Sequence, residues 1–174
     1  MFKELNTMEH FFHEPRREFS VRETARILKI APATASKDLV ELADRGILKV
    51  RDERLAKLYS ANIENESYRD LKKYYTIRKL KDSGFLQELN FFYHNPTVIL
   101  FGSAAAGSDT ESSDVDVIVI SERSDSMPDR AAFEKKFGRR LQLFVVQQLS
   151  QMAKQHLITQ IMNGIVLQGA LQWK

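Results

Sequence analysis

Phe101–Ile120 reads FGSAAAGSDTESSDVDVIVI, and this stretch decides how the second half of the chain folds. Its end, V-D-V-I-V-I, predicts a buried β-strand, because Val and Ile suit a pleated, packed surface. Residues two apart on a strand point to the same face, so we expect Asp114 and Asp116 to lie side by side. Two adjacent carboxylates repel each other unless a cation lies between them, and a divalent cation such as Mg²⁺ prefers oxygen ligands.

A Gly-Ser turn, Gly102-Ser103, follows a second apolar strand expected at Thr97–Phe101. Glycine lets the main chain approach a ligand closely, and the N–H groups of such a turn can bind phosphate. Gly107 and Ser108 continue this connection at the expected start of a short helix, whose N–H groups favour anions. A phosphate-binding turn beside paired carboxylates predicts metal-assisted nucleotidyl transfer.

The pattern Gly-Ser, ten residues, Asp-x-Asp resembles the DNA polymerase β nucleotidyltransferase superfamily, and within it the minimal nucleotidyltransferase (MNT) branch. The resemblance covers residues 83–174 and includes the ending Met162–Gly169, which is similar to the close of that branch. It implies that ATP is the nucleotide and that Mg²⁺ or Mn²⁺ is the metal. It also implies that the phosphates bind Gly102, Ser103, Gly107 and Ser108, and that Asp114 and Asp116 are the catalytic metal ligands.

Two positions depart from the pattern of that family. A later strand, expected at Leu141–Val146, carries Gln142 where the superfamily usually has a third acidic residue. A neutral amide cannot accept a proton from an attacking hydroxyl and binds a metal weakly. Either another residue supplies the base, with Glu134 and Glu111 as poor candidates, or the acceptor needs none, or the protein binds nucleotide without transferring it. The branch often has Arg before the second glycine, and Ala106 removes that phosphate contact.

The first half of the chain is predicted to fold as a winged helix-turn-helix domain. Ser20 followed by Glu23 is a capping-box pattern that begins a helix at Val21. Pro32 ends the turn after it, and a third helix is expected at about 33–45. A strand from Ile47, a charged turn at 51–54 and a second strand at 55–61 form the expected wing.

This layout resembles the winged-helix DNA-binding domains of bacterial and archaeal regulators. The resemblance implies that the third helix enters the major groove of double-stranded DNA and that the wing meets phosphates. Residues 1–82 hold 18 Lys/Arg against 14 Asp/Glu, whereas residues 83–174 hold 8 against 9, which suits DNA contact by the first half. Winged helices also serve as protein-docking modules, and both interpretations stay open. The DNA-binding candidates are Thr34, Ser36, Lys37, Arg51, Arg54 and Lys57.

We therefore expect an α+β protein with three parts: a winged helix-turn-helix domain at 1–62, a linker helix at 63–82, and a small α/β nucleotidyltransferase domain with a mixed sheet at 83–174. Within the last part, residues 149–168 are expected to be mostly helical. The sequence has no cysteine, which excludes disulfides and zinc-thiolate sites. It has no long apolar run and no signal-peptide pattern, so we expect a cytoplasmic protein without a membrane span.

The leading functional hypothesis is a metal-dependent nucleotidyltransferase that moves a nucleoside monophosphate from ATP to a hydroxyl acceptor. The MNT resemblance implies one acceptor, a tyrosine on a HEPN-type toxin, with this chain as the antitoxin. The alternative is a winged-helix transcriptional regulator whose MNT-like domain binds nucleotide without catalysis, which Gln142 favours. An aminoglycoside-modifying transferase is disfavoured, because such enzymes usually carry an extra helical domain. A homodimer is expected, because winged-helix regulators usually read two half-sites.

Overall fold

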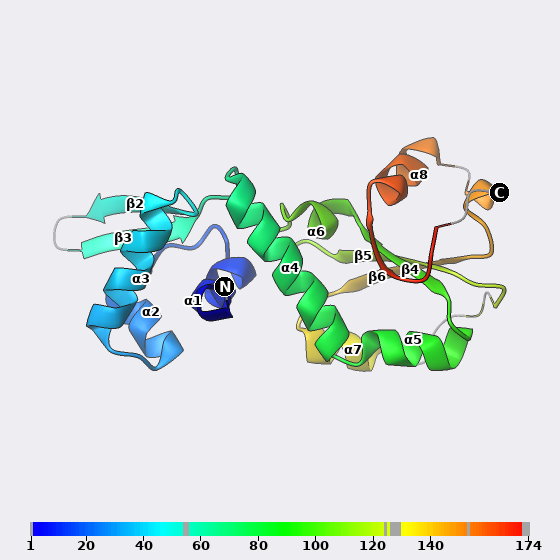
Figure 1. The fold of residues 1–174 in the computed structure, drawn as a ribbon, viewed down its shortest axis with the longest axis horizontal. Helices are drawn as coiled ribbons and strands as arrows, with labels where there is room; N and C mark the ends of the chain where they lie inside the picture. The colour runs from blue at the N-terminus through cyan, green and yellow to red at the C-terminus, as the bar shows by residue number, and fades with distance from the viewer. Residues whose placement is uncertain (1, 54–55, 124, 126–129, 153, 172–174) are drawn as a thin grey trace. The chain divides into compact units, whose positions relative to one another are not determined.

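The computed structural model describes residues 2–53, 56–123, 125, 130–152 and 154–171. The chain divides into two compact units, Met1–Lys72 and Lys73–Lys174, and each has a sheet of its own (Figure 1). The division falls inside helix α4 (Glu66–Asp82), in the segment predicted to be a linker helix. In the part of the chain that the structure describes, no helix is both long and apolar enough to cross a membrane.

The first unit has the helices and the hairpin in the order that the sequence predicts, and it adds a short strand, β1, that was not predicted. Its elements are α1 (Phe2–His13), β1 (Phe19–Ser20), α2 (Val21–Leu28), α3 (Pro32–Asp44), β2 (Leu48–Glu53) and β3 (Ala56–Ala61). The strands form an antiparallel sheet in the order β1-β3-β2, with Phe19 opposite Tyr59. The helix predicted to begin at Val21 does so, and the third helix, expected at about 33–45, begins and ends one residue earlier, at Pro32 and Asp44.

Local residues explain where these helices begin and end. The Ser20 hydroxyl accepts a hydrogen bond from the Glu23 N–H at 3.2 Å, so the predicted N-cap begins α2. Pro32 occupies the first turn of α3, where its fixed φ suits a helix and its missing N–H is not needed. Gly46 follows α3 with a φ of +70°, a conformation that favours glycine and stops the helix.

Aromatic side chains build the core of the first unit. Phe11, Phe19, Tyr59 and Tyr68 are each at most 1 % exposed. The rings of Phe11 and Phe19 meet edge to face, with centroids 5.1 Å apart. The Tyr68 hydroxyl donates to the Phe11 carbonyl at 3.2 Å, which ties the first turn of α4 to α1.

The hairpin departs from the sequence prediction at its turn. A charged turn was expected at 51–54, but β2 continues through Glu53. Across the hairpin Asp52 pairs with Lys57, and opposite charges directly across an antiparallel ladder stabilise it. The charges therefore extend the strand instead of ending it. The tip of the hairpin, which includes Arg54, lies outside the described residues.

The second unit is built on a mixed sheet, as expected. Its elements are α5 (Phe85–Tyr93), β4 (Thr97–Phe101), α6 (Gly102–Ala106), β5 (Val115–Ile120), α7 (Arg130–Phe137), β6 (Leu141–Val146), the short 3₁₀ helix η1 (Leu149–Gln151), α8 (Gln155–Met162) and β7 (Ile165–Gln168). The strand order is β6-β5-β4-β7. Strand β4 is antiparallel to both β5 and β7, and β5 is parallel to β6. The three strands predicted from apolar runs are confirmed with their bounds.

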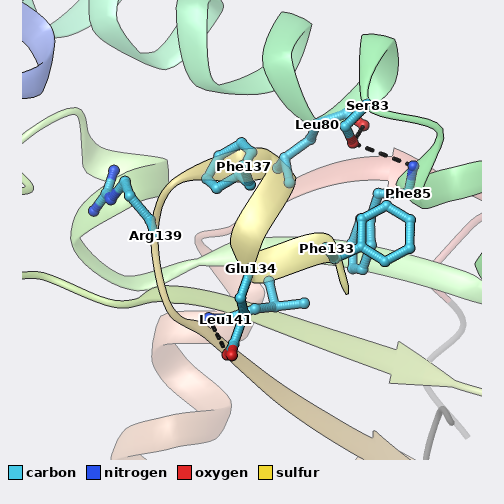
Figure 2. A pocket seen from close by; sticks show the side chains of 8 residues that line it. All are labelled: Leu80, Ser83, Phe85, Phe133, Glu134, Phe137, Arg139 and Leu141. Atoms are coloured by element: carbon cyan, nitrogen blue, oxygen red, sulfur yellow. Dashed lines mark hydrogen bonds between the residues drawn. The ribbon is translucent and has the colours of Figure 1, made fainter. Parts of the chain in front are cut away.

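One polar side chain joins α7 to the start of β6. Glu134 Oε1 accepts a hydrogen bond from the Leu141 N–H at 2.9 Å (Figure 2). Glu134 also lines a small pocket whose other walls include Phe85, Phe133 and Leu80. The Glu134 carboxylate is therefore occupied by a hydrogen bond to the main chain of β6.

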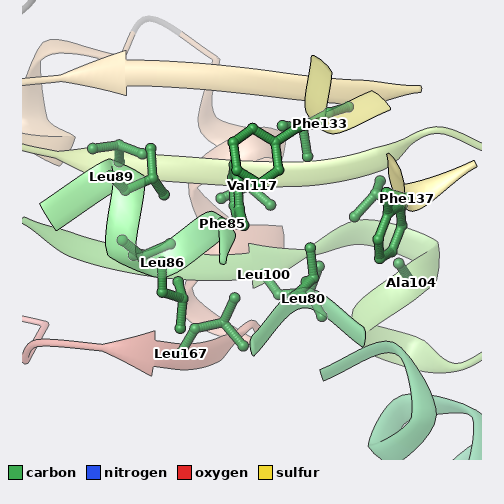
Figure 3. Close-up of a cluster of buried hydrophobic side chains, with 14 of the residues drawn as sticks. Leu80, Phe85, Leu86, Leu89, Leu100, Ala104, Val117, Phe133, Phe137 and Leu167 are labelled. Atoms are coloured by element: carbon green, nitrogen blue, oxygen red, sulfur yellow. The ribbon is translucent and has the colours of Figure 1, made fainter. Parts of the chain in front are cut away.

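Helices cover both faces of the sheet in the second unit. On one face, α5 and α7 contribute Phe85, Leu89 and Phe133, which pack around Val117 of β5 (Figure 3). The rings of Phe85 and Phe133 meet edge to face at 5.2 Å between centroids. This apolar layer holds the strands of the candidate site in a fixed order.

The opposite face packs against α8. Ile161 of α8 lies in a buried cluster with Ile99 of β4 and Ile118 of β5. Because side chains alternate along a strand, Asp116 shares its face with Ile118 and not with Val117. The candidate site therefore belongs to the face that α8 covers.

The final segment corrects the helical expectation for residues 149–168. Helix α8 ends at Met162, and strand β7 pairs antiparallel with β4, with Ile165 opposite Leu100. A Cβ at Gly164 would lie 2.7 Å from both Ile99 Cγ2 and the Leu100 carbonyl oxygen. Only glycine lets the chain approach β4 this closely, and the Ile-Val-Leu run after it then adds a fourth strand.

Candidate active site

The turn from β4 into α6 brings the main chain against a carboxylate. Strand β4 ends at Phe101, whose register partner on β5 is Asp116. Gly102 follows with a φ of +70°, in the left-handed region that favours glycine. A Cβ built at Gly102 would collide with Asp116 Oδ2. The glycine is thus required twice, for the turn and for the close approach to Asp116.

Asp114 and Asp116 lie on either side of the buried Val115 at the start of β5. Asp114 is exposed and Asp116 is half-buried. Burial raises the pKa of Asp116, the negative charge of Asp114 raises it further, and Arg139 opposes both effects. This repulsion is the effect expected of two carboxylates that lie two residues apart at the start of a strand. A cation between them would relieve it.

The four predicted phosphate-binding residues divide into two pairs. Gly102 and Ser103 begin α6 and are half-buried. Gly107 and Ser108 follow its end, which corrects the expectation that they begin a helix. The Gly107 N–H donates to the Ala104 carbonyl at 3.3 Å, and the Ser108 N–H donates to the Ser103 carbonyl at 3.0 Å. Because these two amides close the helix, the second pair offers the exposed Ser108 hydroxyl and not its N–H groups.

Gln142 stands where the sequence placed it, beside the carboxylates. On the parallel pair β5–β6 it is the register partner of Asp116, and its side chain is exposed. Neighbours in register share a face of the sheet, so the Gln142 amide and the Asp116 carboxylate face the same side. The two candidate bases differ in position: Glu134 is bonded to the Leu141 N–H, and Glu111 is exposed in the loop before β5.

Two residues beside the site were missed by the sequence analysis. The side chain of Asp109 is fully buried and forms an ion pair with Arg139, with Asp109 Oδ2 2.5 Å from Arg139 Nη1. Arg139 Nη2 also donates to the Ser113 carbonyl at 2.8 Å. These partners are 30 and 26 residues apart, and no local pattern connects them.

The predicted DNA-binding residues lie on the first unit. Thr34 and Lys37 are exposed on α3 and Ser36 is half-buried there, while Lys57 is exposed on β3. Arg51 of β2 is already engaged. Its guanidinium donates to both carboxylate oxygens of Glu18, at 2.8 and 2.7 Å. A DNA phosphate would have to compete with that bidentate pair.

The donor set of the site suits a hard divalent cation bound together with phosphates. Among the described residues, no group of three or more His, Asp or Glu side chains is arranged to hold a metal ion. Asp114 and Asp116 provide two carboxylates, and Mg²⁺ is commonly held by one or two carboxylates with substrate phosphates and water. The close packing of Gly102 on Asp116 leaves no side chain between the turn and the carboxylate.

Residues 89–170 match a family model described as Polymerase beta, Nucleotidyltransferase. The matched segment runs from within α5 to just beyond β7, so it contains the whole sheet of the second unit and both aspartates. This match supports the nucleotidyltransferase superfamily for this part of the chain. It also supports nucleotidyl transfer as its function, at the level of the superfamily. No curated protein matches the sequence.

Proposed function

We propose that this protein is a metal-dependent nucleotidyltransferase that moves a nucleoside monophosphate from ATP to a hydroxyl acceptor. The observation that carries the proposal is the contact of Gly102 with Asp116, beside Asp114, in a segment that matches the nucleotidyltransferase model. A phosphate chain over this glycine turn would lie next to both carboxylates. Ser103 would add a hydroxyl donor from the first turn of α6.

The reaction requires an acceptor oxygen, a leaving group and a place for one proton. The acceptor hydroxyl oxygen forms a bond to the α-phosphorus, and the bond from that phosphorus to the oxygen bridging to the β-phosphate breaks. Pyrophosphate leaves, and the hydroxyl proton passes to a base or to water. Asp114 and Asp116 would hold the Mg²⁺ or Mn²⁺ ion, which when bound neutralises charge on the triphosphate. The chain itself orients the phosphates through Gly102 and Ser103.

Gln142 supports a second candidate function. It pairs in register with Asp116, at the position where a carboxylate would be placed to accept the acceptor proton. An amide there cannot take that proton. The alternative is therefore a transcriptional regulator whose second unit binds nucleotide and does not transfer it. Nucleotide binding without turnover is its signature.

For the first unit we propose a winged helix that contacts double-stranded DNA. The order of α1 to β3 and the hairpin β2–β3 support this, as do the exposed Lys37 and Lys57. On the resemblance to the MNT branch, a HEPN-type toxin is the proposed protein acceptor and this chain its antitoxin. A homodimer is the proposed assembly, because two half-sites are then read together.

The experiment that tests transfer uses purified protein, Mg²⁺ or Mn²⁺, α-labelled ATP and host lysate as the source of acceptors. We expect label on a protein or small molecule with the wild type and none with Asp116→Asn. Asp125→Asn is the matched control, because Asp125 is an exposed carboxylate beyond the other end of β5. Label that persists in Asp116→Asn would contradict the proposed site. Saturable nucleotide binding without label would favour the regulator.

A further inference from the structure

One guanidinium holds both ends of the loop between α6 and β5. Arg139, in the turn before β6, contacts Asp109 at the start of this loop and Ser113 at its end. The first contact is a charge-assisted hydrogen bond of 2.5 Å to the Asp109 carboxylate, and the second is a 2.8 Å bond to the Ser113 carbonyl. Arg139 therefore connects the two ends of a loop that belongs to neither the helix nor the strand. We call its contacts with Asp109 and Ser113 the Arg139 staple.

The two side chains that form the Arg139 staple are largely buried. The side chain of Asp109 has no exposed area, and that of Arg139 is 15 % exposed. A buried carboxylate needs its cation, so Asp109 fixes where the guanidinium lies. Within the loop, the Thr110 N–H donates to the Ser113 hydroxyl at 2.9 Å, and the Ser113 N–H donates to the Thr110 carbonyl at 3.1 Å. The loop is a compact turn, and Arg139 fixes the position of its last residue, Ser113.

The staple acts on one of the two aspartates. Asp114 comes directly after Ser113 and lies before the first residue of β5. Asp116 is held independently, because it pairs in register with Phe101 on one side and Gln142 on the other. Release of the Ser113 carbonyl would therefore loosen Asp114 on its N-terminal side. The Val115 N–H, which donates to the Arg140 carbonyl at 2.9 Å, and Asp116 would stay in place.

We propose that Arg139, anchored by Asp109, is a positioning residue that sets Asp114 for its role in the site. This inference rests on the proposed function, because it assigns Asp114 a metal–nucleotide ligand to hold. Arg139 is a positioning and not a catalytic residue, because its two terminal nitrogens donate to Asp109 and to the Ser113 carbonyl. Lysine at this position would offer one ammonium nitrogen in place of the two guanidinium nitrogens that bond Asp109 and Ser113, so it should replace Arg139 only in part.

The first test measures binding of Mn²⁺ with α,β-methylene-ATP to the full chain. We expect Arg139→Gln to weaken binding about ten-fold or more, as the loss of a residue that supports a metal ligand does. Arg139→Lys should fall between the wild type and Arg139→Gln. Arg140→Gln is the matched control, because the neighbouring arginine is exposed and should leave binding unchanged.

A double-mutant cycle separates positioning from general damage. If Arg139 acts through Asp114, Arg139→Gln should add little to Asp114→Asn, whereas its effect should add to that of Asp116→Asn. Full additivity with Asp114→Asn would overturn the proposal. Because Arg139→Gln leaves Asp109 buried without its cation, the paired variant Asp109→Asn/Arg139→Gln is measured beside it.

Amide hydrogen exchange gives a result that does not depend on nucleotide. We expect residues 110–114 to exchange faster in both Arg139→Gln and the paired variant, with the sheet unchanged. Unchanged exchange there overturns the staple, whatever the wild type binds. A wild type that binds no nucleotide would instead contradict the proposed function. Wild-type binding that Arg139→Gln fully retains would overturn the positioning role alone.

Discussion

Gly102 and Asp116 form a single contact in which each residue restricts the other. The glycine has no Cβ and so admits the Asp116 oxygen, and its positive φ turns the chain into α6. Phe101, the residue before Gly102, is a buried strand residue in register with Asp116, and neither a positive φ nor the absence of a side chain is required of it. At the scale of the residue, the site is defined by this turn.

Gly102→Ala should abolish or strongly reduce nucleotide binding. A Cβ at this position must displace the Asp116 carboxylate, and the positive φ adds about 1 kcal/mol of backbone strain. Gly138→Ala is the control, because Gly138 has a φ of +76° and no described atom lies within 4 Å of a Cβ built there. Both variants should lose similar stability in chemical denaturation, and only Gly102→Ala should lose binding. Equal binding by the two would contradict the contact.

Gln142→Glu tests the missing base. A carboxylate in register with Asp116 can accept the acceptor proton, and general-base catalysis is typically worth about 100-fold or more. We expect faster transfer of label from ATP, or its appearance where the wild type shows none. Gln87→Glu makes the same change at an exposed position of α5 and should have no effect. A slower rate in Gln142→Glu would show that the amide itself is needed.

At the scale of the element, the sequence predicted the strands and turns that depend on residues close together in the chain. Apolar runs bounded by turn residues placed β4, β5 and β6, and strand periodicity placed Asp114 and Asp116 on one face. Strand β7 was missed because its partner, β4, lies far away in the sequence, and the close approach to β4 that Gly164 permits is not visible in a local pattern. The Asp109–Arg139 pair was missed for the same reason, since its two residues meet only when the loops fold together.

The packing of α1 on α2 predicts a pH-dependent stability. His10 is 8 % exposed, its Nδ1 has no hydrogen-bond partner among the described residues, and its Nε2 lies 3.4 Å from the Thr24 hydroxyl. Burial is the main reason that the pKa of His10 is lowered from 6.5 to about 4. Between these values the unfolded chain binds a proton that the folded chain does not, so stability falls as the pH drops from 6.5 towards 4.

The decrease in the free energy of unfolding caused by His10 should approach 3 kcal/mol, since each pKa unit of this shift corresponds to about 1.4 kcal/mol. Urea denaturation at pH 7 and at pH 4.5 measures it. His10→Leu should remove most of the difference that the histidine causes, whereas His13→Gln should not, because the His13 side chain is 40 % exposed. A wild type and a His10→Leu variant with the same pH dependence would contradict this account.

At the scale of the whole molecule, the chain carries two compact units, Met1–Lys72 and Lys73–Lys174. The excess of basic residues lies in the first half, residues 1–82, and the residues that match the nucleotidyltransferase model lie in the second unit. The sequence indicated this division through its change of motif. The charges do not mark it, because residues 1–72 hold 14 Lys/Arg against 13 Asp/Glu and residues 73–174 hold 12 against 10. A linker helix was expected at 63–82, and the division falls inside α4 in that segment. The exact point of division could not be predicted, because a helical pattern does not reveal which core each turn packs against.

Glu18→Gln should strengthen binding of the first unit to duplex DNA, if that unit contacts phosphates through β2. The change removes the carboxylate that holds Arg51 and leaves the guanidinium for phosphate. Lys57→Ala should weaken binding and reduce the salt dependence by about one phosphate contact. Fluorescence anisotropy of labelled duplex at two salt concentrations measures both, with Glu88→Gln on α5 as the control. Weaker binding by Glu18→Gln would contradict the assignment of Arg51.

The measurement that tests the central claim most directly is calorimetric titration of the protein with α,β-methylene-ATP, with and without Mg²⁺. The claim is that Asp114 and Asp116, beside the Gly102 turn, form a metal–nucleotide site. We predict saturable binding that requires Mg²⁺ and that is lost in the Asp114→Asn/Asp116→Asn double variant, while its fold is retained. Binding that is absent in the wild type, or equally strong in the double variant, would contradict the claim.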